Sequence, residues 1–340
     1  RHKGGYWDLG DPGSVLLREV SCQLSVVRRQ LSVVRGPWSV VRGRGADGEL
    51  ETRSGQDDRG LSLFSPDDWP EEPFSRVIWA EGPGRGIQAV EAPLEICQDS
   101  SGGEHWDSRN HVNRHGVVPL QFRGYRVRIA GRDDSRGWRA SPVVVLADEG
   151  HACGCAPLEF WQKFPTAIEV EQDSLCVGLL PRQFGDLHEL QGGEHCTRTV
   201  WFGFDRDAAA LRQRLTGYHD PLSATCEPSV YSHSQAIPYL PAGDGGYRDE
   251  LRVILQEALE GHRSFFSKRE AIDEYGWRNY GDMWADHEEA YCPDERRPVI
   301  SHYNNQYDLL HSLLVQYLLT GDRRQAGGFR PPSSDGERLR

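Results

Sequence analysis

A chain of 340 residues is long enough for two ordinary domains and for at least one sizeable hydrophobic core. Its formal net charge of -12 argues against a nucleic-acid-binding surface as the main function, because such surfaces carry a basic excess or a strong basic stripe. No run of about 18 apolar residues occurs, so no segment is predicted to span a membrane. Ten Trp and twelve Tyr give more flat, amphipathic surface than a minimal core needs, which suits sugar rings.

The chain begins at Arg1, with no Met and no charged-then-apolar signal segment, so we expect that processing or truncation removed the true start. Between residues 23 and 43 the sequence reads QLSVVRR, QLSVVRG, PWSVVRG, a repeat of seven residues. The β-branched doublets and the Gly-Pro break do not fit a coiled coil, and the unit is too short for a solenoid. We predict a low-complexity insertion at 21–48, extruded as a poorly ordered loop or an Arg-bearing hairpin.

The region from about residue 60 to 205 alternates short β-branched or aromatic runs with clusters of Gly, Pro, Asp and Ser. Examples are RVIWAEGPGRG, YRVRIAGRDDSRG, SPVVVLADEG and CTRTVWFGF. This spacing is typical of a β-sandwich. We predict a β-sandwich domain over 1–205, with the insertion inside it.

Apolar residues recur at helical intervals after about residue 246, as in Leu251, Ile254 and Leu255, and again in Leu310, Leu313 and Leu314. A block of strands followed by a block of helices indicates two separate domains, β then α. The predicted order is a linker at 206–245, a helical domain at 246–323 and a Pro-, Gly- and Ser-rich disordered tail at 324–340.

Eight cysteines are scattered through the chain, and the one close pair is Cys153 and Cys155. A structural zinc site would need a second pair, so no metal site and no cofactor are predicted from the cysteines. Their irregular spacing leaves the presence of disulfides open.

Two polar stretches of the β region have the length and composition of functional loops: QDSSGGEHWDSRNHVNRHG and PRQFGDLHELQGGEHC. The alternative is that their Asn and Asp side chains only satisfy turns. In the helical block, Asp282 and Asp286 would lie one turn apart on a helix. Such a pair could serve glycoside hydrolysis or calcium binding, although no Asp-rich calcium loop follows, and a solvated helix face is the plainer interpretation.

Five longer phrases resemble one known family. They are HKGGYWDLGDPGSVL, QDSSGGEHWDSRNHVNRHGVVPLQFRGYRV, GLLPRQFGDLHELQGGE, YGWRNYGDMWADHE and ISHYNNQYDLLHSLL. The chain is similar, over about 1–20 and 60–323, to the exo-rhamnogalacturonan lyase-like family of polysaccharide lyases. The resemblance implies a central β-sandwich followed by an α/α toroid, here incomplete. It also implies eliminative release of a disaccharide from rhamnogalacturonan I, an acidic plant cell-wall polysaccharide as partner, and a secreted or periplasmic location.

Elimination on a uronate removes the C5 proton and expels the C4 oxygen, so it needs a neutralised carboxylate, a base and an acid. We predict that His302 and Tyr303 supply base and acid and that Asn304 and Arg278 neutralise the carboxylate. The predicted substrate-binding residues are Trp106, Arg109, His111, Asn113, Asn279, Asp286 and His287.

Capping and packing at a helix entrance remain an alternative role for Tyr303, Asn304 and Asn305. Because family members are longer, we expect little or no lyase activity from this chain. Three other functions stay open: non-catalytic carbohydrate binding through Trp106, Trp161 and the polar loops; a glycoside hydrolase using Asp282 and Asp286; and a decayed fragment without function.

Overall fold

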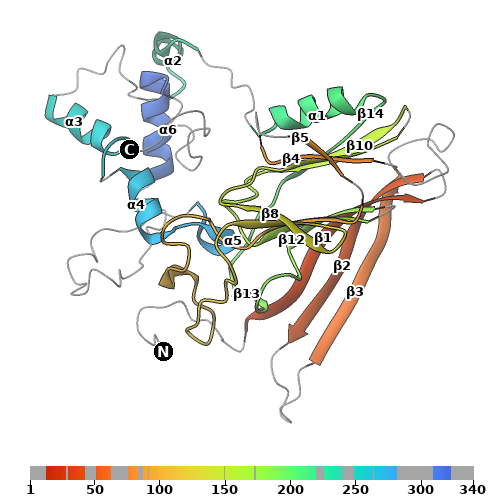
Figure 1. Cartoon of the computed structure of the whole chain (residues 1–340). Coiled ribbons are helices and arrows are strands. Elements are labelled where there is room, and N and C mark those ends of the chain that lie inside the picture. The colour runs from red at the N-terminus through yellow and green to blue at the C-terminus, as the bar shows by residue number, and fades with distance from the viewer. Residues whose placement is uncertain are drawn as a thin grey trace. The chain divides into compact units, whose positions relative to one another are not determined.

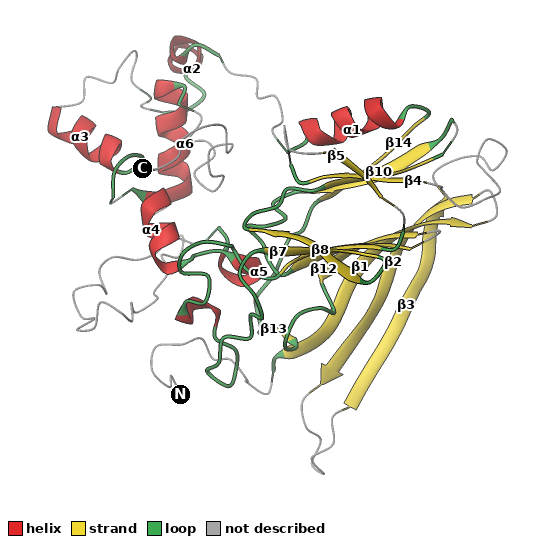
Figure 2. Cartoon of the chain, viewed as in Figure 1, coloured by secondary structure: helices red, strands yellow, loops and turns green. Residues whose placement is uncertain are grey.

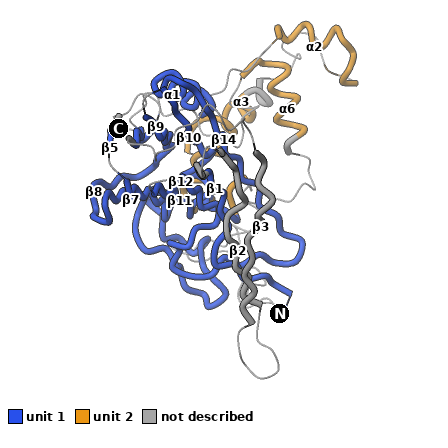
Figure 3. Tube along the Cα trace, turned by 90° about the vertical axis from the view of Figure 1, so that its right-hand side faces the viewer, with its two compact units in different colours: residues 1–219, 275–278 blue, residues 220–274, 279–340 orange. Residues whose placement is uncertain are grey.

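The computed structural model describes residues 13–27, 30–42, 51–62, 76–82, 87–90, 92–148, 150–171, 174–219, 226–238, 240, 249–262, 264–281 and 309–322. The chain divides into two compact units, shown in two colours in Figure 3. The first comprises residues 1–219 and 275–278, and the second comprises residues 220–274 and 279–340. The short segment 275–278 therefore belongs with the β region, although the sequence pattern had grouped it with the helices.

Two antiparallel sheets form the first unit (Figures 1 and 2). The nine-stranded sheet runs in the order β3 (Glu51–Ser62), β2 (Gln30–Arg42), β1 (Val15–Val27), β12 (Ser174–Leu180), β11 (Thr166–Glu171), β6 (Leu94–Gln98), β7 (Tyr125–Ile129), β8 (Arg132–Gly137), with β13 (His188–Leu190) beside β1. The five-stranded sheet runs in the order β14 (Val200–Asp205), β10 (Ala152–Pro157), β9 (Val143–Ala147), β4 (Arg76–Ala80), β5 (Ile87–Val90). This is the β-sandwich-like arrangement that the sequence predicted.

One buried cluster joins the two sheets face to face. The larger sheet contributes alternate residues such as Ile96 and Ile168, and the smaller sheet contributes Val144 and Leu146. Strand alternation places these side chains inward and their neighbours outward. The main core therefore lies between the sheets.

Helix α1 (Ala208–Gly217) covers the outer face of the smaller sheet. Its Leu211 and Leu215, one turn apart, pack with Val143 and Val145 in a second buried cluster. This cluster explains why β9 is buried on both faces and reads as a continuous apolar run. A side chain at Gly203 of β14 would lie 2.7 Å from Leu211, so the missing side chain lets the helix approach.

The expectation of a linker at 206–245 is wrong for the span that α1 occupies. The side chain of Asp207 accepts hydrogen bonds from the amides of Ala209 and Ala210 and so caps the helix start. Leu211 and Leu215 then anchor the helix to the sheet. Helix α2 (Pro228–Ser234) lies in the same span, with Pro in its first turn.

The expectation that residues 21–48 form an extruded loop is also wrong for the described part of the repeat. Strands β1 and β2 pair as a hairpin in which Ser25 lies opposite Ser32. Strand β1 also pairs with β12 over Val20–Ser25, and Leu24 is 1% exposed within the main core. The hairpin alternative therefore fits, with its first strand integrated into the sheet.

Cys153 and Cys155 both point into the main core from β10. Burial raises the pKa of both thiols, which keeps them protonated and unreactive. No disulfide bond joins the cysteines that the structure describes.

The described part of the second unit is helical, as the sequence predicted. Its helices are α2, α3 (Asp249–Glu257), α4 (Phe265–Ile272) and α6 (Leu309–Thr320), and α5 (Gly276–Asn279) ends in it. An α/α toroid is not shown by these helices and stays a prediction. The tail at 324–340 lies outside the described residues.

Candidate functional site

Polar loops gather at one end of the sandwich, around α5 and β13 (Figure 2). They are the loop between β6 and β7, at 99–124, and the loop between β12 and β13, at 181–187. Hydrogen bonds join the two loops, and the segment Tyr275–Arg278 contacts the same end. Three of the phrases that carry the family resemblance thus meet in space.

The segment Tyr275–Arg278 is held by the connection between β10 and β11. The amide of Gly276 donates to the Gln162 carbonyl at 2.7 Å, and the amide of Trp277 donates to the Phe164 carbonyl at 2.8 Å. The Tyr275 ring lies 4.9 Å from the Trp161 ring. Gly276 has φ of +91°, a conformation that favours glycine. Backbone bonds and aromatic packing therefore fix this segment on the sandwich.

Arg278, a predicted catalytic residue, is engaged with the sandwich. Its guanidinium donates to the Glu189 carbonyl, and its Nε lies 3.4 Å from the Glu194 carboxylate. Burial lowers the pKa of Arg278, and Glu194 acts in the opposite direction. Because Arg278 has two acceptors within the protein and little exposure, its main role is to hold the segment Tyr275–Arg278 on the sandwich.

His188 on β13 lies fully buried beside this contact. Its Nε2 lies 3.1 Å from the Pro181 carbonyl, which can only accept, so Nε2 carries the proton. The ring stacks on Phe184 at 4.6 Å and meets Trp277 edge-on at 6.0 Å. Burial lowers the pKa of His188 to about 4, with smaller contributions from nearby arginines. The imidazole is therefore uncharged at neutral pH. The sequence around His188 could not predict this, because it depends on burial by residues from other parts of the chain.

The base of the 99–124 loop is tied down by the buried Asp99. Its carboxylate accepts from the amides of Gln121 and Phe122 at 2.6 and 2.9 Å. Burial raises the pKa of Asp99 to about 6, against the lowering effect of those two bonds. The loop thus has a fixed start and end.

Asn113 joins the two loops. Its Nδ2 donates to Asp186 at 2.7 Å, while its Oδ1 accepts from the amides of His115 and Val117. Arg114 also binds Asp186, at 2.9 Å. Both the Nδ2 and the Oδ1 of Asn113, a predicted substrate contact, are therefore hydrogen-bonded within the protein.

Arg109 and His111 lie on the single turn η2 (Arg109–His111), which Ser108 caps through the amide of Asn110. The His111 ring packs edge-on against Phe164, at 5.1 Å between centroids. Arg109 is exposed, and Trp106 is half-buried. His111 is half-buried as well. All three predicted binding residues therefore lie on one loop and keep part of their surface exposed.

The remaining predicted residues belong to the helical region. Asn279 ends α5 and is buried. Outside the described residues lie Asp282, Asp286, His287, His302, Tyr303 and Asn304. The predicted base and acid, the glycosidase pair and the calcium alternative therefore stay predictions.

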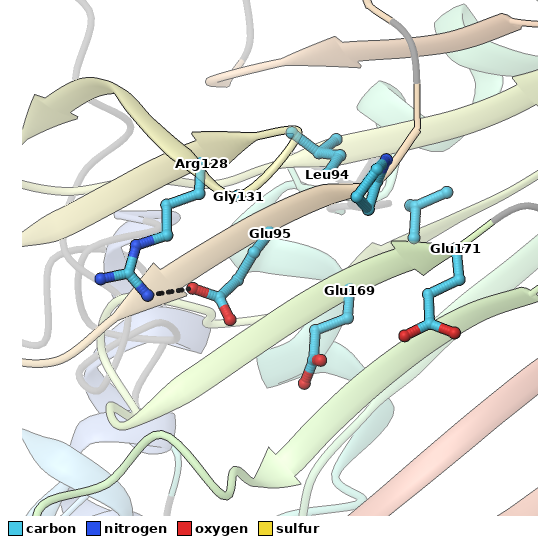
Figure 4. A pocket seen from close by; sticks show the side chains of 8 residues that line it. Leu94, Glu95, Arg128, Gly131, Glu169 and Glu171 are labelled. Atoms are coloured by element: carbon cyan, nitrogen blue, oxygen red, sulfur yellow. Dashed lines mark hydrogen bonds and ion pairs between the residues drawn. The ribbon is translucent and has the colours of Figure 1, made fainter.

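A hollow of about 200 Å³ opens beside β6, β7 and β11, lined by Pro93, Leu94, Glu95, Arg128, Gly131, Glu169, Val170 and Glu171 (Figure 4). Glu95 and Glu169 lie directly opposite each other on neighbouring strands, an unfavourable pairing of like charges. Gln183 bridges them at 3.0 and 2.7 Å, Arg128 lies 3.3 Å from Glu95, and Arg182 binds Glu169. With both carboxylates engaged, and a volume below the roughly 300 Å³ of small ligand pockets, this hollow is a weaker candidate.

Among the residues that the structure describes, no group of three or more His, Cys, Asp or Glu side chains is placed to hold a metal ion. No helix in the described ranges has the length and apolar character needed to cross a bilayer.

No protein-family model matches the chain. No curated protein matches it either.

Proposed function

We propose that the chain is a protein of the rhamnogalacturonan lyase type whose loop end binds galacturonate-containing oligosaccharides with little or no cleavage. The observation that carries the proposal is the meeting of the 99–124 loop, the 181–187 loop and the segment Tyr275–Arg278 at one end of the sandwich. These stretches also carry the family resemblance. An α/α toroid over the helical region is part of the same proposal.

An exposed guanidinium and a half-buried imidazole on a fixed loop suit an acidic sugar. Arg109 offers a planar guanidinium that matches a carboxylate. His111 is held by Phe164 and so presents its ring in one orientation. The loop that carries both is anchored at Asp99 and Asp186, so little order must be gained on binding.

The contacts of Arg278 favour binding over catalysis. Neutralising a uronate carboxylate with Arg278 requires the ligand to compete with Glu194 and the Glu189 carbonyl. In the predicted mechanism, Arg278 would have to give up these contacts before it could neutralise the carboxylate for His302 and Tyr303, the predicted base and acid. We therefore propose that recognition is retained while elimination is slow or absent.

Titration calorimetry with rhamnogalacturonan I oligosaccharides tests the binding. We expect weak binding that Arg109→Ala and His111→Ala each reduce at least about tenfold, the size of one charge-assisted contact. Arg132→Ala and His115→Ala, at exposed positions, are the matched controls and leave affinity unchanged. Equal affinity for a neutral glucan would overturn the proposal.

Absorbance of the conjugated C4–C5 double bond tests the chemistry. We expect no appreciable increase during incubation with the same oligosaccharides. Robust turnover that His302→Ala or Tyr303→Phe abolishes would show an intact lyase and contradict the proposed inactivity. Turnover that survives both substitutions would contradict the assignment of base and acid as well.

A further inference from the structure

Trp138 stands in solvent directly after β8, with 59% of its surface exposed. The guanidinium of Arg123 lies over its ring, 4.4 Å from the centroid. A large aromatic side chain left in water forgoes the stabilisation that its burial would give. A single exposed aromatic side chain is ordinary, but this one carries a guanidinium over its ring, so an apolar surface and a positive charge lie side by side.

The backbone around Trp138 is rigid. The Trp138 carbonyl accepts from the buried Gln98 side chain at 2.8 Å. Gly102 and Gly124 lie very close to the same backbone. A Cβ on Gly102 would lie 2.1 Å from the Trp138 carbonyl oxygen, and one on Gly124 would lie 2.0 Å from the Gly137 carbonyl oxygen. Both glycines have positive φ, so no other residue fits easily. The indole is thus carried on a fixed support, which lowers the entropy lost when a ligand binds.

Arg123 is positioned but not neutralised. Its Nε donates to the Gly102 carbonyl at 3.0 Å, which holds the guanidinium over the indole. No carboxylate of the described residues forms an ion pair with it. The remaining N–H groups of this exposed guanidinium are available to an anionic ligand.

The surroundings add positive charge in a chain whose net charge is -12. Arg126 and Arg136 face each other across β7 and β8, just before Trp138. Both lie near the single carboxylate of Asp133, at 3.8 and 2.6 Å, which Arg128 also binds. Arg128 also lies 3.3 Å from Glu95, so these three guanidiniums are shared between two carboxylates and leave a small positive excess that attracts anions.

We propose that Trp138 and Arg123 form a binding platform for a uronate residue of an acidic oligosaccharide. The apolar face of the sugar ring packs on the part of the indole that Arg123 leaves uncovered, and its carboxylate accepts two hydrogen bonds from the guanidinium beside it. The platform is distinct from Arg109 and His111, and it shares only the class of ligand with the proposed function. A nucleobase would also stack on the indole, so a single-stranded oligonucleotide is included in the test.

Titration calorimetry of the full chain with a galacturonate oligosaccharide tests the platform. Trp138→Ala and Arg123→Gln are each expected to weaken binding at least about tenfold, with Arg123→Lys in between because a lysine keeps the charge but not the fork. Trp201→Ala is the matched control, since Trp201 is 42% exposed and stacks on Tyr218. It is expected to change nothing. Methyl esterification of the ligand removes its charge and keeps its rings. We expect it to weaken binding by as much as Arg123→Gln does.

The outcomes separate this platform from the loop site. Loss of one of two binding sites in Trp138→Ala and Arg123→Gln, and of the other in Arg109→Ala and His111→Ala, supports both proposals. Binding that is lost in Trp138→Ala and Arg123→Gln but unchanged in Arg109→Ala supports the platform and contradicts the proposed function. Binding lost only in Arg109→Ala and His111→Ala overturns the platform and leaves the proposed function. The platform is also overturned if the wild-type protein binds no acidic oligosaccharide. It is overturned as well if the binding that depends on Trp138 is tighter for the oligonucleotide than for the oligosaccharide.

Discussion

Replacing His188 by Gln should abolish a specific pH dependence of stability. A glutamine amide can still donate to the Pro181 carbonyl, as Nε2 of His188 does at 3.1 Å, but it does not titrate. His188 has its pKa lowered from 6.5 to about 4 because it is buried. A base with a depressed folded-state pKa stabilises the fold fully above pH 6.5 and loses that contribution as the pH falls through 4.

The expected size follows from this difference in pKa. At about 1.4 kcal/mol for each tenfold change in proton affinity, the wild-type protein loses roughly 3 kcal/mol between neutral pH and pH 4 through this group. Asp99 works in the opposite sense over the same range, because its pKa is raised from 3.8 to about 6. Its contribution is fully present below pH 3.8 and is lost as the pH rises through 6, so the wild-type profile alone would conceal the His188 effect.

Urea unfolding of wild type and His188→Gln between pH 4 and 7.5 isolates the effect, because Asp99 is common to both. We expect the stability advantage of the wild type to shrink by roughly 3 kcal/mol toward pH 4. His115→Gln, which alters an exposed imidazole, serves as control and should track the wild type. An advantage of the wild type that stays constant with pH would refute the reasoning, since it would mean that His188 titrates as it does in the unfolded chain.

Three further changes test the fold. Leu24→Ala should cost about 2–5 kcal/mol in urea unfolding, because Leu24 is 1% exposed in the core; a negligible loss would remove β1 from the sheet. Gly203→Ala should destabilise by about 1–3 kcal/mol by pushing α1 outward, whereas Gly217→Ala, with open space around it, should not. Asp186→Ala should speed amide hydrogen exchange around Asn113 with little change in global stability, and unchanged exchange there would contradict the loop crosslink.

The sequence predicted the strand-rich body and the later helices because both have a local period that residues near in sequence reveal. It misread α1, although Asp207 followed by Leu211 and Leu215 is a start signal with one-turn spacing. The composition of the surrounding span outweighed that short signal. The strands of the repeat were missed for another reason. Because the repeat length of seven is an odd number, equivalent residues of successive repeats lie on opposite faces of a strand. The alternation that marks a strand is therefore hidden.

The arrangement of the loop end could not be predicted, because its contacts join residues far apart in sequence. Arg278 reaches a carbonyl 89 residues earlier, and Asn113 reaches a carboxylate 73 residues later. No local pattern fixes such pairs. The sequence identified the residue types correctly as polar and clustered, but not which would be used by the protein itself.

The difference between Arg278 and Arg123 shows why that distinction matters for function. A carboxylate approaching Arg278 must displace Glu194 in a largely desolvated site, and the displaced glutamate would then need a new partner. A carboxylate approaching Arg123 displaces only water, because this guanidinium is exposed and is held by a backbone carbonyl and an indole. The proposed recognition of an acidic sugar therefore favours an exposed guanidinium such as that of Arg123 over Arg278, which secures the segment that completes the loop end.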